Sequence, residues 1–351
     1  MLTSRQLLIL QLTVNDFIES AQPVGSRQLS KKPEAPFSPA TIRNEMADLE
    51  EMGFLEKTHS SSGRIPSEKG YRFYVDHLMR PVHLEDSEVT YVRSLFQREI
   101  VESEELIRNT ASILSDLTSY TAVLLGPDHS MHTVKQFDVV SLNNEQAVAI
   151  IVTDTGRVES RTFDVPNHLD VSDIEKLVNI LNDRLVGTPL SQLHYKLQTE
   201  VYSLLERHIE RVDEWYRVLV EAMTVDQKSE LFFSGKLNMM KQPEFHDLEK
   251  VEVLFSLMDR STPATTFFRG NERGIHVRIG SENEHDAMED CSIITADYTA
   301  GTGMDGAIAI IGPKRMYYER VVSILDVISH QLSDQFERRT TRYELMRRNE
   351  R

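Results

Sequence analysis

The chain has 351 residues, of which 40% are hydrophobic and 27% charged, with a formal net charge of -16. This length is too great for one ordinary domain and suits two or three, each able to bury a core. No run of about twenty apolar residues appears, and the first residues lead into an amphipathic pattern without a cleavage site, so we expect a cytoplasmic protein without membrane contact. The single cysteine, Cys291, excludes an intramolecular disulfide framework and a multi-cysteine zinc site.

Charge is distributed unevenly along the chain. Residues 1–80 contain ten Lys and Arg and ten Asp and Glu, so the whole acidic excess lies beyond residue 80. The neutral segment is suited to meet phosphates, whereas the acidic remainder would repel nonspecific DNA. Because nonspecific binding is almost wholly electrostatic, we hypothesise that this repulsion favours a specific site over competing DNA.

The first part of the chain predicts two helices separated by a break. Residues 4–21 carry apolar side chains at helical spacing, enough for one buried face. Pro23-Val24-Gly25 ends this helix, and Ser26 is a suitable cap for a short helix over residues 27–31. A proline-containing loop follows.

Residues 38–53 predict a third helix, and the sequence contains capping signals at both of its ends. Ser38 is a suitable N-cap, Pro39 suits the first helical position, and Gly53 can adopt the left-handed conformation that closes the helix. One face of this helix is apolar and the opposite face is small or polar; the residues are Ile42, Met46 and Leu49 on the first, and Ala40, Arg43, Asn44 and Ala47 on the second.

The acids Asp48, Glu50 and Glu51 lie in the C-terminal half of this predicted helix. A helix that enters the major groove by its N-terminal end needs this arrangement, since acids near phosphate would repel it. This stretch alone fits an ordinary amphipathic surface helix equally well. The surroundings favour the DNA-binding interpretation, because residues 54–58 predict a strand, 60–63 a turn and 64–65 a returning strand, which together make a winged helix-turn-helix over residues 1–80.

Eight residues are the candidates for DNA contact. Arg43 and Asn44 are the choices for base contacts, because Arg pairs with guanine and Asn with adenine through two hydrogen bonds. The other candidates are suited to phosphate or the minor groove; they are Thr41, Arg27, Lys57, His59, Arg64 and Lys69.

Several motifs resemble the HrcA family of bacterial heat-inducible transcription repressors. In the first eighty residues these are Pro23-Val24-Gly25-Ser26, Ala40-Thr41-Ile42-Arg43-Asn44-Glu45-Met46, Ser62-Gly63-Arg64-Ile65-Pro66 and Lys69-Gly70-Tyr71-Arg72. Later motifs are Asn238 with Pro243-Glu244-Phe245, Ile279-Gly280-Ser281-Glu282-Asn283, and Gly312-Pro313-Lys314-Arg315-Met316. The resemblance covers nearly the whole chain.

The resemblance implies a homodimeric repressor without enzymatic activity, which binds an inverted-repeat operator in double-stranded DNA upstream of chaperone operons. It further implies that the GroE chaperonin supports the activity. The implied architecture is α+β, with a winged helix-turn-helix at 1–80, a discontinuous GAF-like domain at 88–133 and 227–338, and an inserted dimerisation domain at 134–226. The insert is expected to hold a three-stranded antiparallel sheet and helices.

The pattern beyond residue 80 agrees with this organisation. A helical segment is predicted over 88–118, and period-two patterns predict strands at 135–142, 146–153 and 157–165, joined by turn signals into a meander. Helices follow at 172–186, 189–197 and 200–224, and strands and helices alternate from residue 229 to a closing helix over 320–336. The basic tail, residues 339–351, is expected to be a frayed, solvated end.

The remaining motifs do not indicate chemistry. Residues 301–306 match GxGxxG, but they precede a predicted strand instead of opening a helix, so a strand-to-strand loop is expected. The histidines show no metal-binding spacing, and no nucleophile elbow or Walker loop appears, so no cofactor and no metal are expected. An alternative function is a metabolite-sensing or bifunctional regulator with a small-molecule site in the GAF-like domain.

Overall fold

The computed structural model divides the chain into two compact units. Unit 1 comprises Met1–Gly126, Glu230–Ala300 and Gly306–Glu337, and unit 2 comprises Pro127–Ser229, Gly301–Asp305 and Arg338–Arg351. The structure describes residues 2–58, 63–80, 82, 84–96, 103–127, 132–143, 145–154, 156–165, 171–208, 216–217, 220, 231–245, 247–259, 274–283, 285–300 and 305–349. We call residues 2–80 the head, and the rest of unit 1 the body.

Three helices begin the head: α1 (Ser4–Ser20), α2 (Ser26–Leu29) and α3 (Pro39–Glu51). Thr3 and Gln6 form a capping box at the start of α1, and Ala21 ends the helix with a φ of 52°. Apolar side chains from the three helices form the buried core of the head, among them Ile9, Leu10, Val14, Leu29, Ile42 and Leu49. The predicted short helix is displaced by one residue at its start, because Gly25 is the cap and Ser26 is already helical.

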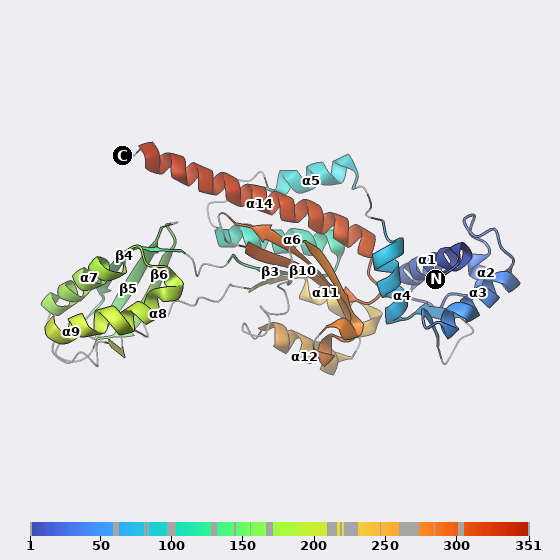
Figure 1. Cartoon of the computed structure of the whole chain (residues 1–351), viewed down its shortest axis with the longest axis horizontal. Helices are drawn as coiled ribbons and strands as arrows, with labels where there is room; N and C mark the ends of the chain where they lie inside the picture. The colour runs from blue at the N-terminus through green and yellow to red at the C-terminus, as the bar shows by residue number, and fades with distance from the viewer. Residues whose placement is uncertain are drawn as a thin grey trace. The chain divides into compact units, whose positions relative to one another are not determined.

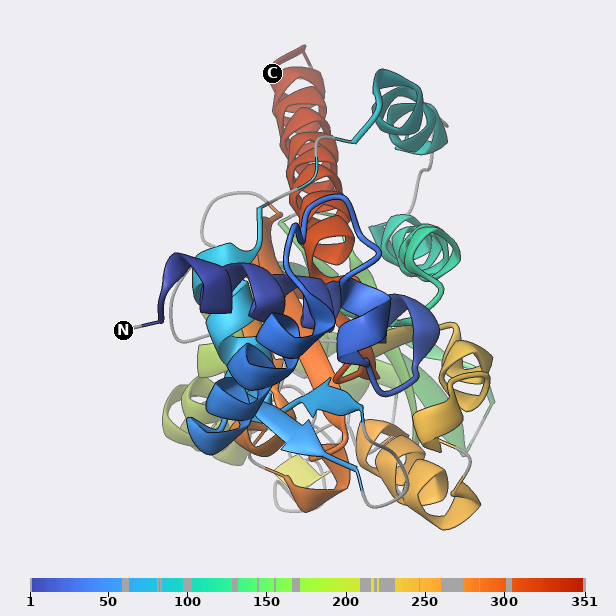
Figure 2. The ribbon, with the colours of Figure 1, turned by 90° about the vertical axis from the view of Figure 1, so that its right-hand side faces the viewer.

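A short hairpin follows the third helix. Strands β1 (Leu55–Lys57) and β2 (Arg64–Pro66) pair antiparallel and are shown as blue arrows in Figure 2. Val24 forms an antiparallel bridge with Arg64, so the segment between α1 and α2 lies against the hairpin. A Cβ at Gly63 would lie 2.8 Å from the backbone of Pro23, so this close approach requires glycine.

Helix α4 (Glu68–Phe73) continues into a π-helical turn, η1 (Tyr74–Leu78), which ends before the extended Met79. Ser67 caps α4, and its hydroxyl also donates to the carbonyl of Gly53 over 2.6 Å. One side chain therefore joins the start of α4 to the end of α3.

The body is built on a five-stranded sheet of order β7-β3-β10-β9-β8. The pairs β7–β3, β3–β10 and β9–β8 are antiparallel. The strands are β3 (Thr121–Leu125), β7 (Leu231–Ser234), β8 (Ile275–Ile279), β9 (Cys291–Thr299) and β10 (Asp305–Pro313). Strand β9 ends at Thr299 and β10 begins at Asp305, within the GxGxxG motif, so the predicted strand-to-strand connection is confirmed; residues 301–304 lie outside the described residues.

Helices cover both faces of this sheet (Figure 1). On one face lies α14 (Tyr318–Asn349), where Tyr298 stacks on Phe336 and the hydroxyls of Ser292 and Tyr318 are 2.7 Å apart. On the other face, α11 (Lys236–Met240), η4 (Pro243–Phe245) and α12 (Leu248–Asp259) share a core with residues of β3, β9 and β10. Short 3-10 turns are η5 (Gly280–Glu282) and η6 (Asp286–Met288).

The helical region after the head differs from the prediction. The sequence predicts one segment over 88–118, whereas the structure has α5 (Asp86–Phe96) and α6 (Ser103–Thr118). Residues 97–102 lie outside the described residues. The basic tail also differs, because the backbone of α14 is helical through Asn349 instead of ending at residue 336.

Unit 2 contains the predicted three-stranded meander, in the order β4-β5-β6 with both pairs antiparallel. Its strands are β4 (Val134–Ser141), β5 (Gln146–Thr153) and β6 (Val158–Asp164). Its helices are α7 (Val171–Leu185), the turn η2 (Leu190–Gln192), α8 (Leu193–Lys196), the π-helical turn η3 (Leu197–Val201) and α9 (Tyr202–His208). Side chains such as Phe137, Ile151 and Leu181 form a core between one face of the sheet and these helices.

Candidate nucleic-acid interface

The leading turns of α3 present a capped, uncharged or cationic surface. The hydroxyl of Ser38 accepts from the amide of Thr41 over 3.1 Å, and the two hydroxyls are 2.9 Å apart. The first turn of the helix contains no acid. Arg43 and Asn44 are exposed, and Thr41 is half-buried. Because Ile42, Met46 and Leu49 are buried, the two proposed base-contacting side chains lie outside the core of the head.

Two of the four acids on α3 are paired with arginines. Glu45 accepts from Arg5 of α1 over 2.9 Å, and Glu50 accepts from Arg64 of β2 over 2.6 Å. The guanidinium of Arg5 also lies 5.1 Å from the centre of the Phe37 ring. Asp48 and Glu51 are exposed. The pairing leaves the negative charge of α3 concentrated at its rear, away from Arg43 and Asn44.

The hairpin side of the head contains three more candidates, and they have different surroundings. Lys57 is exposed on β1. The side chain of Arg64 is only 17% exposed and forms an ion pair with Glu50. Its backbone carbonyl accepts from the amide of Val24 over 2.8 Å, and its amide donates to the carbonyl of Val24 over 2.9 Å. The ammonium of Lys69 donates to the carbonyl of Met52 over 2.7 Å and lies 4.5 Å from the centre of the Phe54 ring. Lys69 therefore closes the C-terminal end of α3, where the helix dipole favours a cation.

Arg27 is exposed on α2, and His59 lies outside the described residues. Lys32, a further cation of this segment, forms an ion pair with the buried Asp16 of α1. The structure thus brings Arg43 and Asn44 together on one exposed surface. Arg64 and Lys69 already have intramolecular partners, so a phosphate contact by either side chain would have to form beside these interactions.

The sequence analysis predicts neither the Arg5–Glu45 pair nor the Arg64–Glu50 pair. The partners are 40 and 14 positions apart, so no helical or strand spacing connects them. The sequence offers no signal for either pair beyond the presence of acids on a helix that is expected to approach phosphates.

The thiol of Cys291 and the side chains that could bind a metal have surroundings that do not favour a reactive site. Cys291 is fully buried, and burial raises the pKa of its thiol to about 12, which suppresses the reactive thiolate. Among the described residues, no group of three or more His, Cys, Asp or Glu side chains comes together as a metal site. In the same part of the chain, no helix has both the length and the apolar character needed to cross a bilayer.

Comparison with known proteins identifies the family. A family profile described as HrcA protein C terminal domain matches residues 104–322. The heat-inducible transcription repressor HrcA of Lysinibacillus sphaericus is 55% identical over 337 residues, which cover 96% of this chain and 98% of the relative. The protein of the same name from Bacillus pumilus (strain SAFR-032) is 53% identical over 335 residues, covering 95% and 98%.

The fold has also been seen in a solved structure. A crystal structure of a hypothetical protein aligns with 97% of this chain and 100% of its own, with a TM-score of 0.62 and 22% sequence identity. This likeness concerns the fold alone. The profile match and the two full-length relatives establish that the chain belongs to the HrcA family.

Proposed function

We propose that this protein is a sequence-specific transcriptional repressor of heat-shock chaperone operons, which binds an inverted-repeat operator as a homodimer in the cytoplasm. Two relatives that are more than half identical over nearly the full chain are named heat-inducible transcription repressors. In this proposal the head is a winged helix-turn-helix, with α3 as the recognition helix and the β1–β2 hairpin as the wing. Two heads related by a two-fold axis read the two half-sites, and occupation of the promoter represses transcription.

The observation that carries the proposal is the surface of α3. Its N-terminal turns have a side-chain cap, no acid in the first turn, and exposed Arg43 and Asn44, while Glu45 and Glu50 are paired with cations. Such a tip can approach base edges in the major groove without repelling the phosphates. Arg27 and Lys57 are exposed and suited to phosphate contact, together with Thr41.

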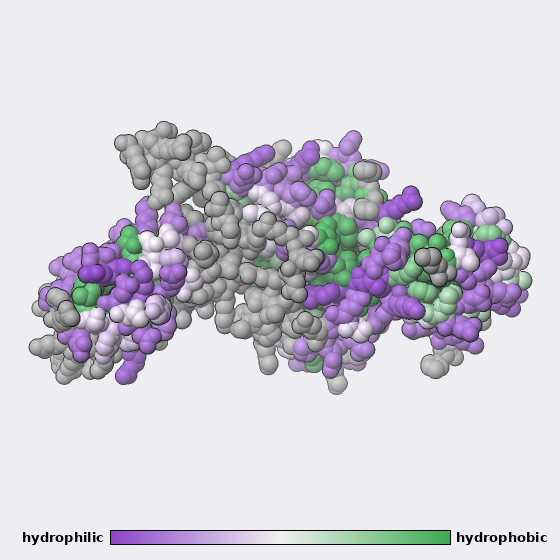
Figure 3. Space-filling view, viewed as in Figure 1, coloured by the Kyte–Doolittle hydropathy of each residue, from purple (hydrophilic) through white to green (hydrophobic). Residues whose placement is uncertain are grey.

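Dimerisation is proposed to use unit 2. One face of its sheet is covered by helices, and the alternation of β5 places Val148, Ile150 and Val152 on the opposite face, where all three are partly exposed. The register adds Val140 opposite Val148 and Val158 opposite Val152, which are 46% and 59% exposed. Hydrophilic residues cover much of the visible surface of this unit, with isolated hydrophobic ones among them (Figure 3). A partly apolar sheet face of this kind suits pairing with a second copy.

The body is proposed to be the GAF-like domain, built around the five-stranded sheet. We further propose that the GroE chaperonin supports activity, and that the dimer loses DNA binding on heating when chaperonin is occupied elsewhere. The family membership supports this part of the proposal. Full operator affinity of the purified protein after prolonged heating without chaperonin would contradict it.

The direct test of the function is a footprint on DNA upstream of the host's chaperone operons, followed by binding to the protected palindrome. Specific repressors bind their sites roughly 10³ to 10⁷ times more tightly than other DNA. We expect a clear preference for the palindrome over a scrambled duplex of equal length at physiological ionic strength. Equal affinity for the two duplexes would overturn the proposal.

A further inference from the structure

Helix α4 presents an arginine to the body. The guanidinium of Arg72 donates to Glu282 through Nε over 2.7 Å, and Nη2 donates to the carbonyl of Val277 over 2.6 Å as well as to the second oxygen of Glu282. Glu282 is itself held in place, because its carboxylate accepts from the amide of Ile279 over 2.8 Å. A two-point contact between a planar guanidinium and a carboxylate fixes orientation as well as distance.

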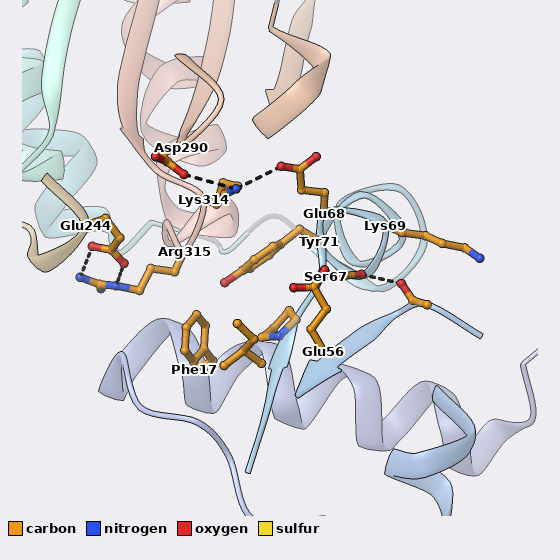
Figure 4. A pocket seen from close by; sticks show the side chains of 13 residues that line it. Phe17, Glu56, Ser67, Glu68, Lys69, Tyr71, Glu244, Asp290, Lys314 and Arg315 are labelled. Carbon is orange, nitrogen blue, oxygen red and sulfur yellow. Dashed lines mark hydrogen bonds and ion pairs between the residues drawn. The ribbon is translucent and has the colours of Figure 1, made fainter. Parts of the chain in front are cut away.

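One helical turn earlier, Glu68 makes the complementary contact. Its carboxylate accepts from the amide and hydroxyl of Ser281, at 3.2 and 2.6 Å, and from the ammonium of Lys314 at 3.1 Å. Lys314 lies between Glu68 and Asp290, as Figure 4 shows. Burial raises the pKa of Glu68, but the hydrogen bonds from Ser281 and Lys314 outweigh it and lower the pKa overall.

The backbone of the body is shaped to receive this acid. Gly280 has a φ of +56°, and a Cβ there would lie 2.1 Å from a carboxylate oxygen of Glu68. The conformation favours glycine at this position, and a Cβ there would displace the Glu68 carboxylate. The segment from Ile279 to Glu282 therefore binds α4 through two side chains of one helix face: Glu68 contacts Ser281, and Arg72 contacts Glu282. We call this segment the socket.

A third contact follows in the π-helical turn. The hydroxyl of Tyr74 lies 2.9 Å from Asn15 of α1 and 3.0 Å from Glu319 of α14, so it connects the head to the body. Nearby, the rings of Tyr71 and Tyr318 are 6.0 Å apart, and both residues are buried. Glu68 and Tyr71 line a cavity of about 420 Å³ together with Lys314 and Arg315 of the body (Figure 4). Glu68, Arg72 and Tyr74, with their partners in the body, are called the joint below.

We propose that the joint fixes the orientation of the head on the body, so that Glu68 and Arg72 are positioning residues that set which half-site separation the dimer accepts. This inference rests on the proposed function. A head held by one hydrogen bond or by apolar packing alone could rotate about its linker. The Arg72–Glu282 fork and the Glu68 socket lie one turn apart and remove that freedom. Neither residue needs to touch DNA for this role.

The first test needs no DNA. Spin labels are placed on Glu51→Cys in the head and Leu237→Cys in the body, and labelled protein is diluted with unlabelled protein so that distances within one chain dominate. Both positions are exposed, whereas the native Cys291 is fully buried and does not compete for the label. We expect a narrow distance distribution in the parent protein and a broad one when Glu68→Ala and Arg72→Ala are added. An equally narrow distribution in that variant would overturn the proposal that the joint fixes the head on the body.

The second test uses operators whose half-sites are moved apart by two base pairs, which rotates one half-site by about 70° relative to the other. We expect the parent protein to lose at least about tenfold in affinity on this DNA, and the Glu68→Ala/Arg72→Ala variant to lose no more than about threefold. Arg72→Lys, which keeps the charge without the planar fork, should fall between them. Equal sensitivity to spacing in parent and variant would overturn the proposal.

The matched control is Arg320→Ala, which breaks an Arg320–Glu88 pair of 2.9 Å within the body. It should keep both the narrow distance distribution and the parent's sensitivity to spacing. Tighter binding of the joint variant to the unmodified operator would also overturn the proposal, since the joint would then be inhibitory. If the parent protein fails to distinguish operator from scrambled DNA, the proposed function fails, and the spin-label distances still decide whether the joint holds the head.

Discussion

The guanidinium of Arg64 donates to the carboxylate of Glu50 over 2.6 Å, which ties the second strand of the hairpin to the rear of α3. The same residue pairs through its backbone with Val24, in the segment between α1 and α2. Arg64 therefore connects three parts of the head that are far apart in the chain. A residue in this position can act on DNA directly or through the helix that it holds.

Arg64→Ala and Glu50→Ala separate these two roles. We expect Arg64→Ala to reduce the slope of log affinity against log salt by about 1, as the loss of one phosphate contact does, and to cost about 1 kcal/mol of stability. Glu50→Ala breaks the same pair but keeps the cation, so its salt slope should stay that of the parent. The measurement is operator binding over a salt series, with thermal unfolding alongside. A parent-like slope for Arg64→Ala would assign the residue to holding the hairpin alone.

Arg43→Ala tests the base-reading role of the exposed tip of α3. We expect it to cost roughly 1 to 3 kcal/mol at the operator and to change binding to random DNA very little, because a bidentate base contact is lost without disturbing the core. Titration of both duplexes at one salt concentration measures the difference. Equal losses on both would remove Arg43 from base recognition, and Asn44→Ala should behave as Arg43→Ala does if the two residues read adjacent bases.

Lys69→Met tests a cation that the structure places at the end of α3. The substitution removes the hydrogen bond to the carbonyl of Met52 and the contact with the Phe54 ring, while it keeps an unbranched side chain. We expect a loss of about 1 kcal/mol in the free energy of unfolding, from the helix terminus and the ring together. Thermal unfolding measures this, with Lys57→Met as the control on exposed β1. Unchanged stability together with a reduced salt slope would make Lys69 a phosphate contact only.

The lowered pKa of Glu68 predicts a pH dependence. A carboxyl whose pKa is lower in the folded state adds stability that is present above the unfolded pKa of about 4.5 and is lost as pH falls through the folded pKa. The melting temperature of the parent should therefore exceed that of Glu68→Gln at pH 7, and the gap should close at pH values below about 4.5. Glu56→Gln, at an exposed position of β1, is the control for the loss of one carboxylate from the head. A gap that stays constant with pH would mean that the charge of Glu68 is not involved.

We propose that the dimer interface is the face of the unit 2 sheet opposite its helices, and this proposal predicts that a single charge on that face disrupts the dimer. Val158→Asp places a carboxylate on this face, where the parent residue is 59% exposed. We expect sedimentation to report monomers at concentrations where the parent is dimeric, because an unpaired charge in an interface is strongly unfavourable. Val186→Asp introduces the same charge after α7, where the parent valine is 48% exposed, and should remain dimeric. Dimers of both variants would exclude this face.

Much of the local structure could be predicted because its signals are short-range. Ser38, Pro39 and Gly53 bound α3 closely, and the turn signals at residues 143–145 and 154–156 separate the strands of the meander. The predictions were less accurate where apolar spacing continues through a break. The segment over 88–118 contains two helices, and α14 continues beyond residue 336 because nothing in the basic tail stops a helix.

The amino-acid sequence by itself determined the bounds of α3, the segregation of charge and the resemblance to the family, because caps, periodicity and motifs depend on neighbouring residues. Only the tertiary structure decided which charges are paired. Arg5 with Glu45, Arg64 with Glu50, and Arg72 with Glu282 are separated by 40, 14 and 210 positions, and chain folding alone brings them together. The strength of an ion pair depends on distance in space, and sequence spacing carries that distance only within a single helix or hairpin.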